Sequence, residues 1–312
     1  MHQGLKTLFL GSTLLFAAPA FAQGDDASGA GGGSATVGAG ADANAGAAGA
    51  GAGATVSASA GGTMGGAWSD QLINNPQTLP KAGLGLLADF EILKINIPNP
   101  IDPTMSASAT AEFLELGAGY GVSDKLTVGA TYAVDIHDDG GTFPSDDRWK
   151  GPLGLYGAFN VINKDKLSVT AGADFSINLG NTDDKAIHAG LSAKYMLSPK
   201  LAVYTGNVLP IGPAGQHLSI SLADSGPITF AIPVGVALQA TPQIFAFADT
   251  TLASFSISNS ANEFIFSDFI PLDVGVLFRA AKDLDVGVQF QDDLKNAGDF
   301  YQFGLMARYY KH

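Results

Sequence analysis

The sequence predicts an all-β protein: a transmembrane antiparallel up-and-down β-barrel of about 12 strands, preceded by a disordered Gly/Ala-rich segment. Charged residues make up only 14% of the 312 residues, against about 25% in ordinary soluble domains, while hydrophobic residues make up 46%. The chain has 40 glycines and no cysteine. From Lys81 onward, apolar residues alternate with small or polar ones. This period of two is typical of strands that turn one face to an apolar environment.

Residues 1–22 are predicted to be a signal peptide. Lys6 precedes an apolar run over Leu8–Ala18, and Ala20-Phe21-Ala22 forms a cleavage site of the A-x-A type. A transmembrane anchor is the alternative, but the run is shorter than the roughly 20 residues that span a bilayer. We therefore expect export from the cytoplasm and a mature chain that begins at Gln23.

Residues 23–80 are predicted to be a low-complexity periplasmic spacer. Gly24–Gly66 consists mostly of Gly, Ala, Ser and Thr, so it cannot bury enough apolar surface to offset the entropy of ordering. The alternatives are a tether that binds another envelope component and Ala-Gly stretches that stack as sheet between chains. A flexible spacer is favoured because no residue in the segment is chemically specific.

Residues 81–312 are predicted to form the barrel. The clearest strand is Leu167–Leu179, in which seven apolar residues alternate with six small or polar ones. At about 3.3 Å per residue, a strand of this length crosses the hydrocarbon core even when it is tilted. The same alternation predicts further strands over residues 83–94, 111–121, 126–134, 151–160, 187–197, 201–209, 228–238, 243–252, 270–279, 284–291 and 301–309.

The predicted connections alternate in length. Short turns are expected at residues 123–125, 163–166, 198–200, 241–242 and 281–283. Longer loops are expected at residues 96–108, 136–150, 210–227 and 258–269, with shorter ones near 181–184 and 295–299. Outer-membrane barrels have short periplasmic turns and long external loops, so we expect the long loops outside the cell and both termini in the periplasm. A secreted β-sandwich is disfavoured because its strands are typically shorter and its surface more charged.

With this pattern the chain resembles the bacterial outer-membrane β-barrel proteins of the porin-like superfamily. The resemblance covers residues 81–312 and the signal, and it rests on pattern without any family motif. It implies localisation in the bacterial outer membrane, with membrane lipid and the barrel-assembly machinery as partners. Such proteins commonly end on an aromatic residue that this machinery recognises, whereas here Tyr309 and Tyr310 precede Lys311 and His312.

Strand parity predicts the ionisable residues that face the lumen. They are Asp89, Glu91, Glu115, Asp135, Asp174, His188, Lys194, Asp249, Asp273, Arg279, Asp285 and Arg308. If water fills the lumen, this acidic excess favours cations. In a closed interior the same charges pair with one another. A 12-stranded barrel lies between the filled eight-stranded and the open sixteen-stranded cases, so both hypotheses remain open.

Two smaller features also concern the interior. Most predicted strands place a glycine on the inward face, which leaves room for water, a ligand or a plug, or else only permits the strands to bend. Pro233 falls on an inward position of a predicted strand. Because a closed barrel has no free edge, Pro233 predicts a bulge or a kink.

An outer-membrane hydrolase is a rival hypothesis. His217-Leu218-Ser219 has the spacing of a catalytic His-x-Ser pair, but Ala231 stands where the third, orienting group is expected. The acidic stretch around His137, with Asp135, Asp138, Asp139, Asp146 and Asp147, is interpreted as a solvated loop, because no metal-ligand spacing is recognisable. We therefore predict no enzyme activity, no cofactor and no metal site.

The predicted function is a passive channel for small polar or amphipathic solutes with a weak preference for cations. A structural or adhesive barrel with a filled lumen and the hydrolase are the alternatives. Nucleic acid is excluded as a partner, because the net charge is −13 and phosphate binding requires clustered basic residues. The sequence leaves the solute and the oligomeric state open.

Overall fold

The computed structural model describes residue 69 and residues 71–98, 106–138, 149, 151–164, 166–213, 215, 217–222, 227–258, 263–266 and 270–311. The predicted signal peptide and the Gly/Ala-rich part of the predicted spacer lie outside these residues. In the described part of the chain, no helix has both the length and the apolar character needed to cross a membrane.

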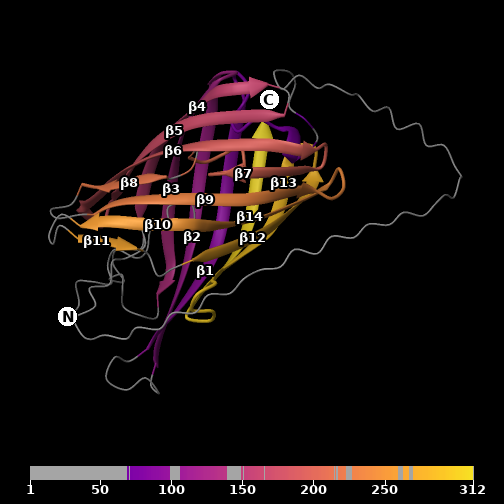
Figure 1. Ribbon diagram of the computed structural model, residues 1–312. Helices are drawn as coiled ribbons and strands as arrows, with labels where there is room; N and C mark the ends of the chain where they lie inside the picture. The colour runs from indigo at the N-terminus through magenta and orange to yellow at the C-terminus, as the bar shows by residue number, and fades with distance from the viewer. Residues whose placement is uncertain are drawn as a thin grey trace, which may run out of the picture.

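The strands form one closed antiparallel barrel (Figure 1). The ring closes where β1 (Leu84–Pro98) pairs with β14 (Phe300–Lys311). The strands between them are β2 (Ser106–Ser123), β3 (Leu126–Asp138), β4 (Pro152–Lys164), β5 (Leu167–Asn178), β6 (Asn181–Ser198), β9 (Ile228–Gln239), β10 (Ile244–Ser258), β12 (Pro271–Ala281) and β13 (Leu284–Asp293).

Two positions in the ring are each shared by two strand segments. β7 (Leu201–Thr205) and β8 (Leu218–Ser221) both pair with β6 on one side and with β9 on the other. β11 (Glu263–Phe266) and β12 both pair with β10. The 14 segments therefore occupy 12 positions in the ring. The predicted 12-stranded barrel is confirmed.

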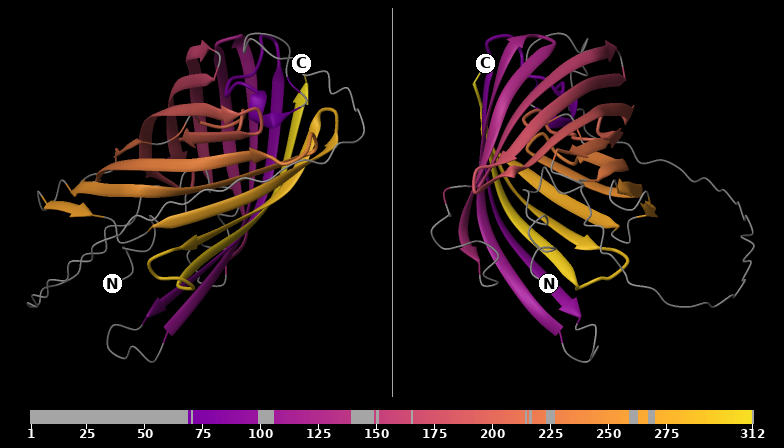
Figure 2. Two further views of the ribbon diagram at one scale, coloured as in Figure 1. Left: turned by 45° about the vertical axis from the view of Figure 1, so that its right-hand side comes forward. Right: turned by 90° about the vertical axis from the view of Figure 1, so that its left-hand side faces the viewer.

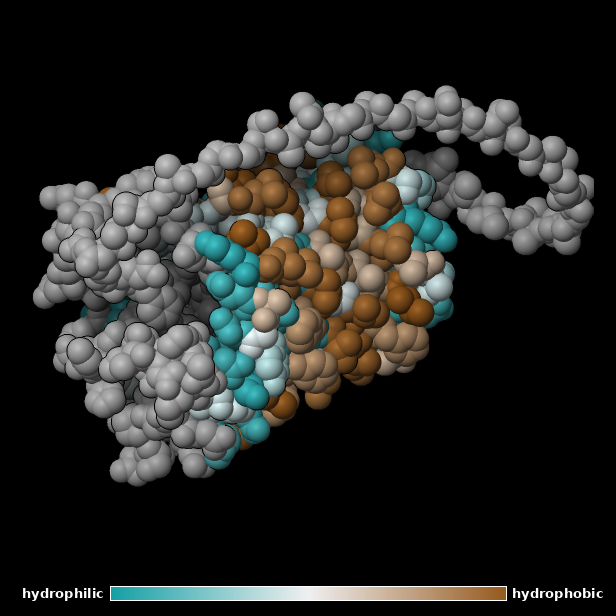
Figure 3. Space-filling model, turned by 60° about the horizontal axis from the view of Figure 1, so that its bottom comes forward, coloured by the Kyte–Doolittle hydropathy of each residue, from teal (hydrophilic) through white to brown (hydrophobic). Residues whose placement is uncertain are grey.

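The alternation of the sequence places apolar side chains on the outer surface. In β14, Phe303, Leu305 and Tyr309 are exposed, whereas their neighbours Gln302 and Arg308 are buried. Figure 3 shows a broad hydrophobic band on one face of the molecule, with hydrophilic residues beside it. Such a band on a closed barrel is the surface that a lipid bilayer covers.

The predicted irregularity at Pro233 is confirmed. The pairing of β9 with β10 shifts between Thr251 and Ala253, directly opposite Pro233, and leaves Leu252 as the extra residue. Proline has no N–H to donate to a neighbouring strand. The carbonyl of Pro233 accepts a hydrogen bond of 2.5 Å from the Thr205 hydroxyl, on the side where the neighbouring strand position is interrupted.

One predicted loop is wrong. Residues 210–227 do not form a single external loop, because residues 218–221 are strand β8 and continue the line of β7. The described residues between β7 and β8 turn into the barrel, where Leu209 and Ile211 are buried. Composition rich in Gly and Pro predicts irregular backbone, but it does not distinguish an external loop from an internal one.

Candidate functional site: the filled short-turn end

Two segments fill the barrel at the end where the short turns lie, which we call the short-turn end. The first is residues 71–82, the plug segment, which precedes β1. The second is residues 206–217, the insertion, which interrupts the strand position of β7 and β8. Figure 2 shows the plug segment in dark purple inside the ring of strands, close to the C-terminal end. Residues 71–80 belong to the range that the sequence assigns to the spacer.

The plug segment enters the barrel with apolar side chains. It contains a short 3₁₀ helix, η1 (Leu72–Asn74). Leu72, Ile73 and Leu79 are buried, and they join a core with inward side chains of the strands such as Phe245 and Leu277. In a membrane barrel the outward apolar side chains face lipid, so this internal core needs a separate set of apolar residues.

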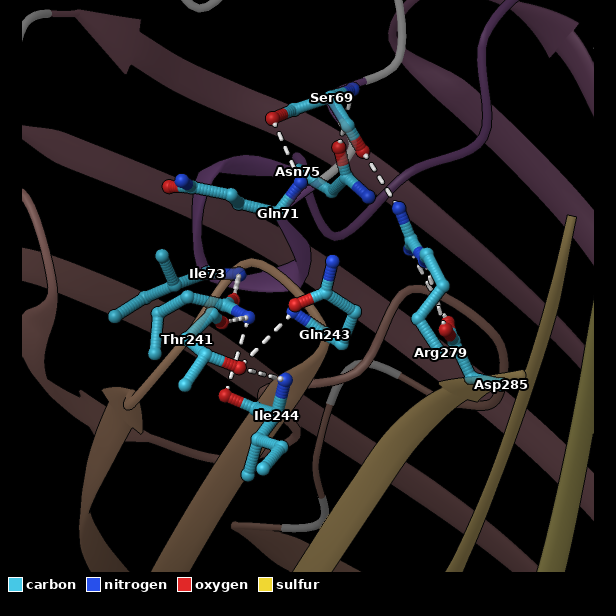
Figure 4. Close-up of polar contacts among 10 residues, drawn as sticks. Ser69, Gln71, Ile73, Asn75, Thr241, Gln243, Ile244, Arg279 and Asp285 are labelled. Carbon is cyan, nitrogen blue, oxygen red and sulfur yellow. Dashed lines mark hydrogen bonds and ion pairs between the residues drawn. The ribbon is translucent and has the colours of Figure 1, made fainter. Parts of the chain in front are cut away.

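Main-chain hydrogen bonds place the plug segment across the barrel. Ile73 N–H donates to Gln239 Oε1 at 3.2 Å, and Leu79 N–H donates to Thr127 Oγ1 at 2.8 Å. Gln239 belongs to β9 and Thr127 to β3, which lie on nearly opposite sides of the ring. Figure 4 shows Ile73 beside the β9–β10 turn. The segment therefore spans the lumen and does not merely line one wall.

The insertion packs against other strands. It leaves β7 at Gly206, whose φ is +69°. Gly212 N–H donates to the Tyr156 hydroxyl of β4 at 3.3 Å. A Cβ built on Gly85 of β1 would lie 2.5 Å from Ile211 Cδ1, so this inward glycine is needed for the close approach of Ile211. Inward glycines are predicted to leave room for water, a ligand or a plug, and at Gly85 the room is taken by chain of the insertion.

All three basic residues predicted to face inward donate to carbonyl oxygens in these internal segments or just before the plug segment. Lys194 Nζ lies 2.6 Å from Asn75 O, and Arg308 Nη1 lies 3.2 Å from Ile211 O. Arg279 Nη1 lies 3.5 Å from the carbonyl oxygen of Ser69, just before the plug segment (Figure 4). The basic side chains of the interior thus lie where the plug segment and the insertion cross the lumen.

The two arginines also belong to a row of charges on adjacent strands. Arg279 Nε lies 2.9 Å from Asp285 Oδ1, and Arg308 Nη2 lies 3.3 Å from Asp89 Oδ2. Asp285 is opposite Arg308 in register, and Asp89 is opposite Glu115. Positive and negative groups therefore alternate from β12 through β13 and β14 to β1, which is the pairing that a closed interior requires, whereas the next step, from Asp89 to Glu115 of β2, places two acids side by side.

The other predicted residues form separate contacts. Asp174 Oδ1 lies 2.6 Å from His188 Nδ1. Tyr204 donates its hydroxyl to Asp249 at 2.6 Å, and Asp249 is opposite Asp273 in register. Among all twelve predicted residues, those that are buried are Asp89, Glu91, Glu115, Asp174, His188, Lys194, Asp285 and Arg308. Those that are half-buried are Asp135, Asp249, Asp273 and Arg279.

His217 closes the gap left by the interrupted strand. Its Nδ1 accepts the Leu191 N–H of β6 at 3.3 Å, and its Nε2 lies 3.0 Å from Thr205 Oγ1. Because the Thr205 hydroxyl donates to Pro233 O, the network assigns the Nε2–H tautomer to a neutral His217. His217 thus joins β6 to β9 and does not contact Ser219 as a catalytic base.

The plug segment contains polar atoms that are buried without a partner. Asn75 Nδ2, Gln77 Oε1 and Thr78 Oγ1 have no hydrogen-bond partner, whereas no atom of the described part of the insertion is in this state. Each such atom costs about 1–3 kcal/mol, and burying each of Leu72, Ile73 and Leu79 stabilises by about 1.5–3 kcal/mol. The polar atoms without partners therefore offset part of the stabilisation that burial of the three apolar side chains provides.

Sequence analysis missed the plug segment and the inward course of the insertion. The available signal was apolar residues in segments assigned to solvent: Leu72 and Ile73 in the spacer, and Ile211 in the predicted loop. Val208 and Leu209 fall in the strand predicted over residues 201–209, but strand β7 ends at Thr205. Such residues need a core to bury them. No group of three or more His, Cys, Asp or Glu that could hold a metal occurs among the described residues.

The chain matches no protein-family model and no curated protein. It is similar in structure to an outer-membrane channel from Pseudomonas putida F1, with a TM-score of 0.52 and 11% identity over 75% of this chain and 97% of that one. The KdgM porin, also solved in complex with disordered oligogalacturonate, has a TM-score of 0.45 and 7% identity over 72% of this chain and 99% of its own. NanC porin has a TM-score of 0.46 and 6% identity over 72% and 100%. The similarity to the Pseudomonas channel shows that this chain has the fold of an outer-membrane β-barrel.

Proposed function

We propose that the protein is a porin-like channel of the bacterial outer membrane for small polar or amphipathic solutes, and that the plug segment closes it. One observation carries the proposal: a barrel of 12 strands with an apolar outer face is filled at one end by a crossing segment of chain. Side chains of the wall fill an eight-stranded barrel, but a wider barrel leaves a lumen. A lumen filled by chain opens when that chain moves. The outer-membrane fold supports this location, and we expect export by the signal peptide and insertion by the barrel-assembly machinery.

The plug segment is the element that we infer to move. It continues toward the Gly/Ala-rich residues 24–66, which we propose act as a flexible spacer in the periplasm. The insertion, by contrast, is held at both ends by β7 and β8 and is fastened by His217. The buried polar atoms without partners also belong to the plug segment. Withdrawal toward the periplasm therefore pulls on one strand only, β1, whereas movement of the insertion pulls on both β7 and β8.

We further infer a weak preference for cations beyond the filled end. Lys194, Arg279 and Arg308 are engaged by carbonyl oxygens near the short turns. Glu91 and Asp174 lie deeper along their strands, away from the short turns. An acidic wall concentrates cations, and the effect fades with rising salt because the screening length is about 8 Å at physiological ionic strength.

Deletion of residues 71–80 is expected to increase ion conductance in planar bilayers, because it removes the crossing segment and leaves the barrel strands intact. Deletion of residues 45–54 is the matched control, since it shortens the spacer by the same length and should leave the conductance of the full chain unchanged. Folding of each variant is checked by its mobility on gels with and without heating. A folded variant lacking residues 71–80 that remains silent at several voltages contradicts the channel.

That silent outcome would favour the second candidate function, a structural or adhesive barrel with a filled lumen. The observation behind it is the continuous internal core that joins Leu79 and Ile211 to the inward side chains of the strands. A hydrolase is disfavoured, because His217 is engaged by Leu191 and Thr205. We therefore do not assign an enzyme activity.

The orientation gives a separate prediction. With short turns in the periplasm, a cysteine replacing Trp149, which is 74% exposed, should react with a membrane-impermeant maleimide on intact cells. A cysteine replacing Ser198, the last residue of β6 beside the β6–β7 turn, should react only after the outer membrane is permeabilised. The chain has no cysteine of its own, so each signal reports a single position. Equal labelling of both variants on intact cells would contradict this orientation.

A further inference from the structure

Lys194 is a buried cation whose partner is unusual. Its side chain is fully buried on β6, and its Nζ donates to the main-chain oxygen of Asn75 at 2.6 Å. No carboxylate among the described residues forms an ion pair with it. Buried charges are normally paired with an opposite charge. A neutral carbonyl therefore occupies the place where a negatively charged oxygen would be a stronger partner.

The surroundings of Lys194 are rich in hydroxyl and amide groups. Ser168 of β5 lies opposite Lys194 in register, and Thr170 lies opposite Ser192. Asn160 Nδ2 lies 3.3 Å from Ser168 Oγ and 3.4 Å from Thr170 Oγ1. All of these side chains are buried. One ammonium group surrounded by neutral donors is the chemistry that recognises an oxyanion.

We propose that Lys194, with Ser168, Thr170, Ser192 and Asn160, forms a binding site for the carboxylate of a small solute, and that Asn75 O occupies this site while the channel is closed. The inference rests on the proposed function, because the site is free only when the plug segment withdraws. The plug segment also covers Ser192, whose hydroxyl lies 2.6 Å from Gln77 Nε2. The Ser192 hydroxyl donates to Asn207 O of the insertion, so its oxygen is an acceptor at the edge of the site. Solute and plug segment therefore compete chiefly for Lys194.

Because the solute and the plug segment compete for Lys194, binding of the solute favours the open channel. A ligand that binds only the open state shifts the population toward that state. If the open state is rare, a solute at twice its dissociation constant raises the open fraction about threefold, by the factor 1 + [L]/Kd. The acidic residues farther along the barrel disfavour a bare anion, but they do not disfavour a zwitterion that carries an ammonium group beside its carboxylate.

The test measures exposure of the plug segment in the full-length protein in lipid vesicles. Thr78 is fully buried and its hydroxyl has no hydrogen-bond partner, so Thr78→Cys introduces a thiol of similar size at little cost. A maleimide added from the short-turn side labels this thiol only when the plug segment withdraws. Labelling rates are compared in sodium acetate, in sodium chloride of equal ionic strength, and in chloride with added glycine.

We expect glycine, or glycine and acetate, to raise the labelling rate about threefold or more near saturation of the site. In the background of Lys194→Met, labelling should be faster and should no longer respond to either solute. Lys200→Met, in the exposed β6–β7 turn, is the matched control and should keep the response. Folding of every variant is checked by heat-dependent gel mobility, and Ser168→Ala provides a milder second change that should reduce the response.

Three outcomes separate this inference from the proposed function. Measurable labelling at rates that are equal in chloride, acetate and glycine overturns the carboxylate site and leaves the movable plug segment intact. A solute response that persists after Lys194→Met overturns the role of Lys194. If folded protein is never labelled at position 78, the plug segment does not withdraw, and the proposed function fails together with the site.

Discussion

Replacement of Arg308 by Met is expected to destabilise the barrel by about 3–5 kcal/mol, the usual cost of leaving a buried charge without its partner. Arg308 contacts Asp89 at 3.3 Å, and Asp89 Oδ1 already lacks a hydrogen-bond partner. The variant also loses the hydrogen bond from Arg308 to Ile211 O. Urea unfolding in lipid vesicles measures the free energy of unfolding, and Lys282→Met in the exposed β12–β13 turn is the control.

A double variant separates the two contacts of Arg308. Combining Arg308→Met with Asp89→Leu removes both charges, so most of the lost stability should return if the unpaired carboxylate causes the loss. The part of the free energy of unfolding that the double variant does not regain measures the hydrogen bond from Arg308 to Ile211 O of the insertion. A loss below about 1 kcal/mol for Arg308→Met alone would contradict the filled interior, because a charge facing water loses little when its partner is removed.

Replacement of Ala171 by Arg is expected to cost about 2–4 kcal/mol, because a charge is then held near the middle of the bilayer on the lipid face. Ala171 lies near the middle of β5 and follows the fully buried Thr170, so it points outward. The free energy of unfolding from lipid vesicles again provides the measurement.

The depth dependence of this effect gives its control. Ala280→Arg makes the same chemical change at an exposed position beside the β12–β13 turn, where the expected cost is only about 0–1 kcal/mol. Equal costs at the two positions would show that the membrane does not surround the middle of β5. A larger cost at Ala280 would reverse the assignment of the faces.

The sequence alone determined the wall of the barrel. Lipid is apolar around the whole circumference of the barrel, so every strand has the same alternation of apolar and polar residues. A local pattern such as Leu167–Leu179 is therefore sufficient to predict a strand of the wall. The short turns at residues 123–125, 198–200 and 281–283 follow equally from local composition. Parity also places Lys194, Arg279 and Arg308 on the inward side of their strands, where the structure has them donate to internal carbonyl oxygens.

The contacts of those inward residues follow from the tertiary structure and not from the local pattern. Asn75 lies 119 residues before Lys194, and Ile211 lies 97 residues before Arg308, so no local period records either contact. Residues 71–82 and 206–217 lack a regular pattern because irregular chain inside a lumen does not turn one repeating face to a single surface. Their apolar residues, such as Ile73 and Ile211, become understandable only when a ring of 12 strands encloses more space than its own side chains fill. The strands of the wall are therefore predictable from a short-range period, because lipid surrounds all of them alike. The contacts at the filled end depend on closure of the ring, which brings together residues far apart in the sequence.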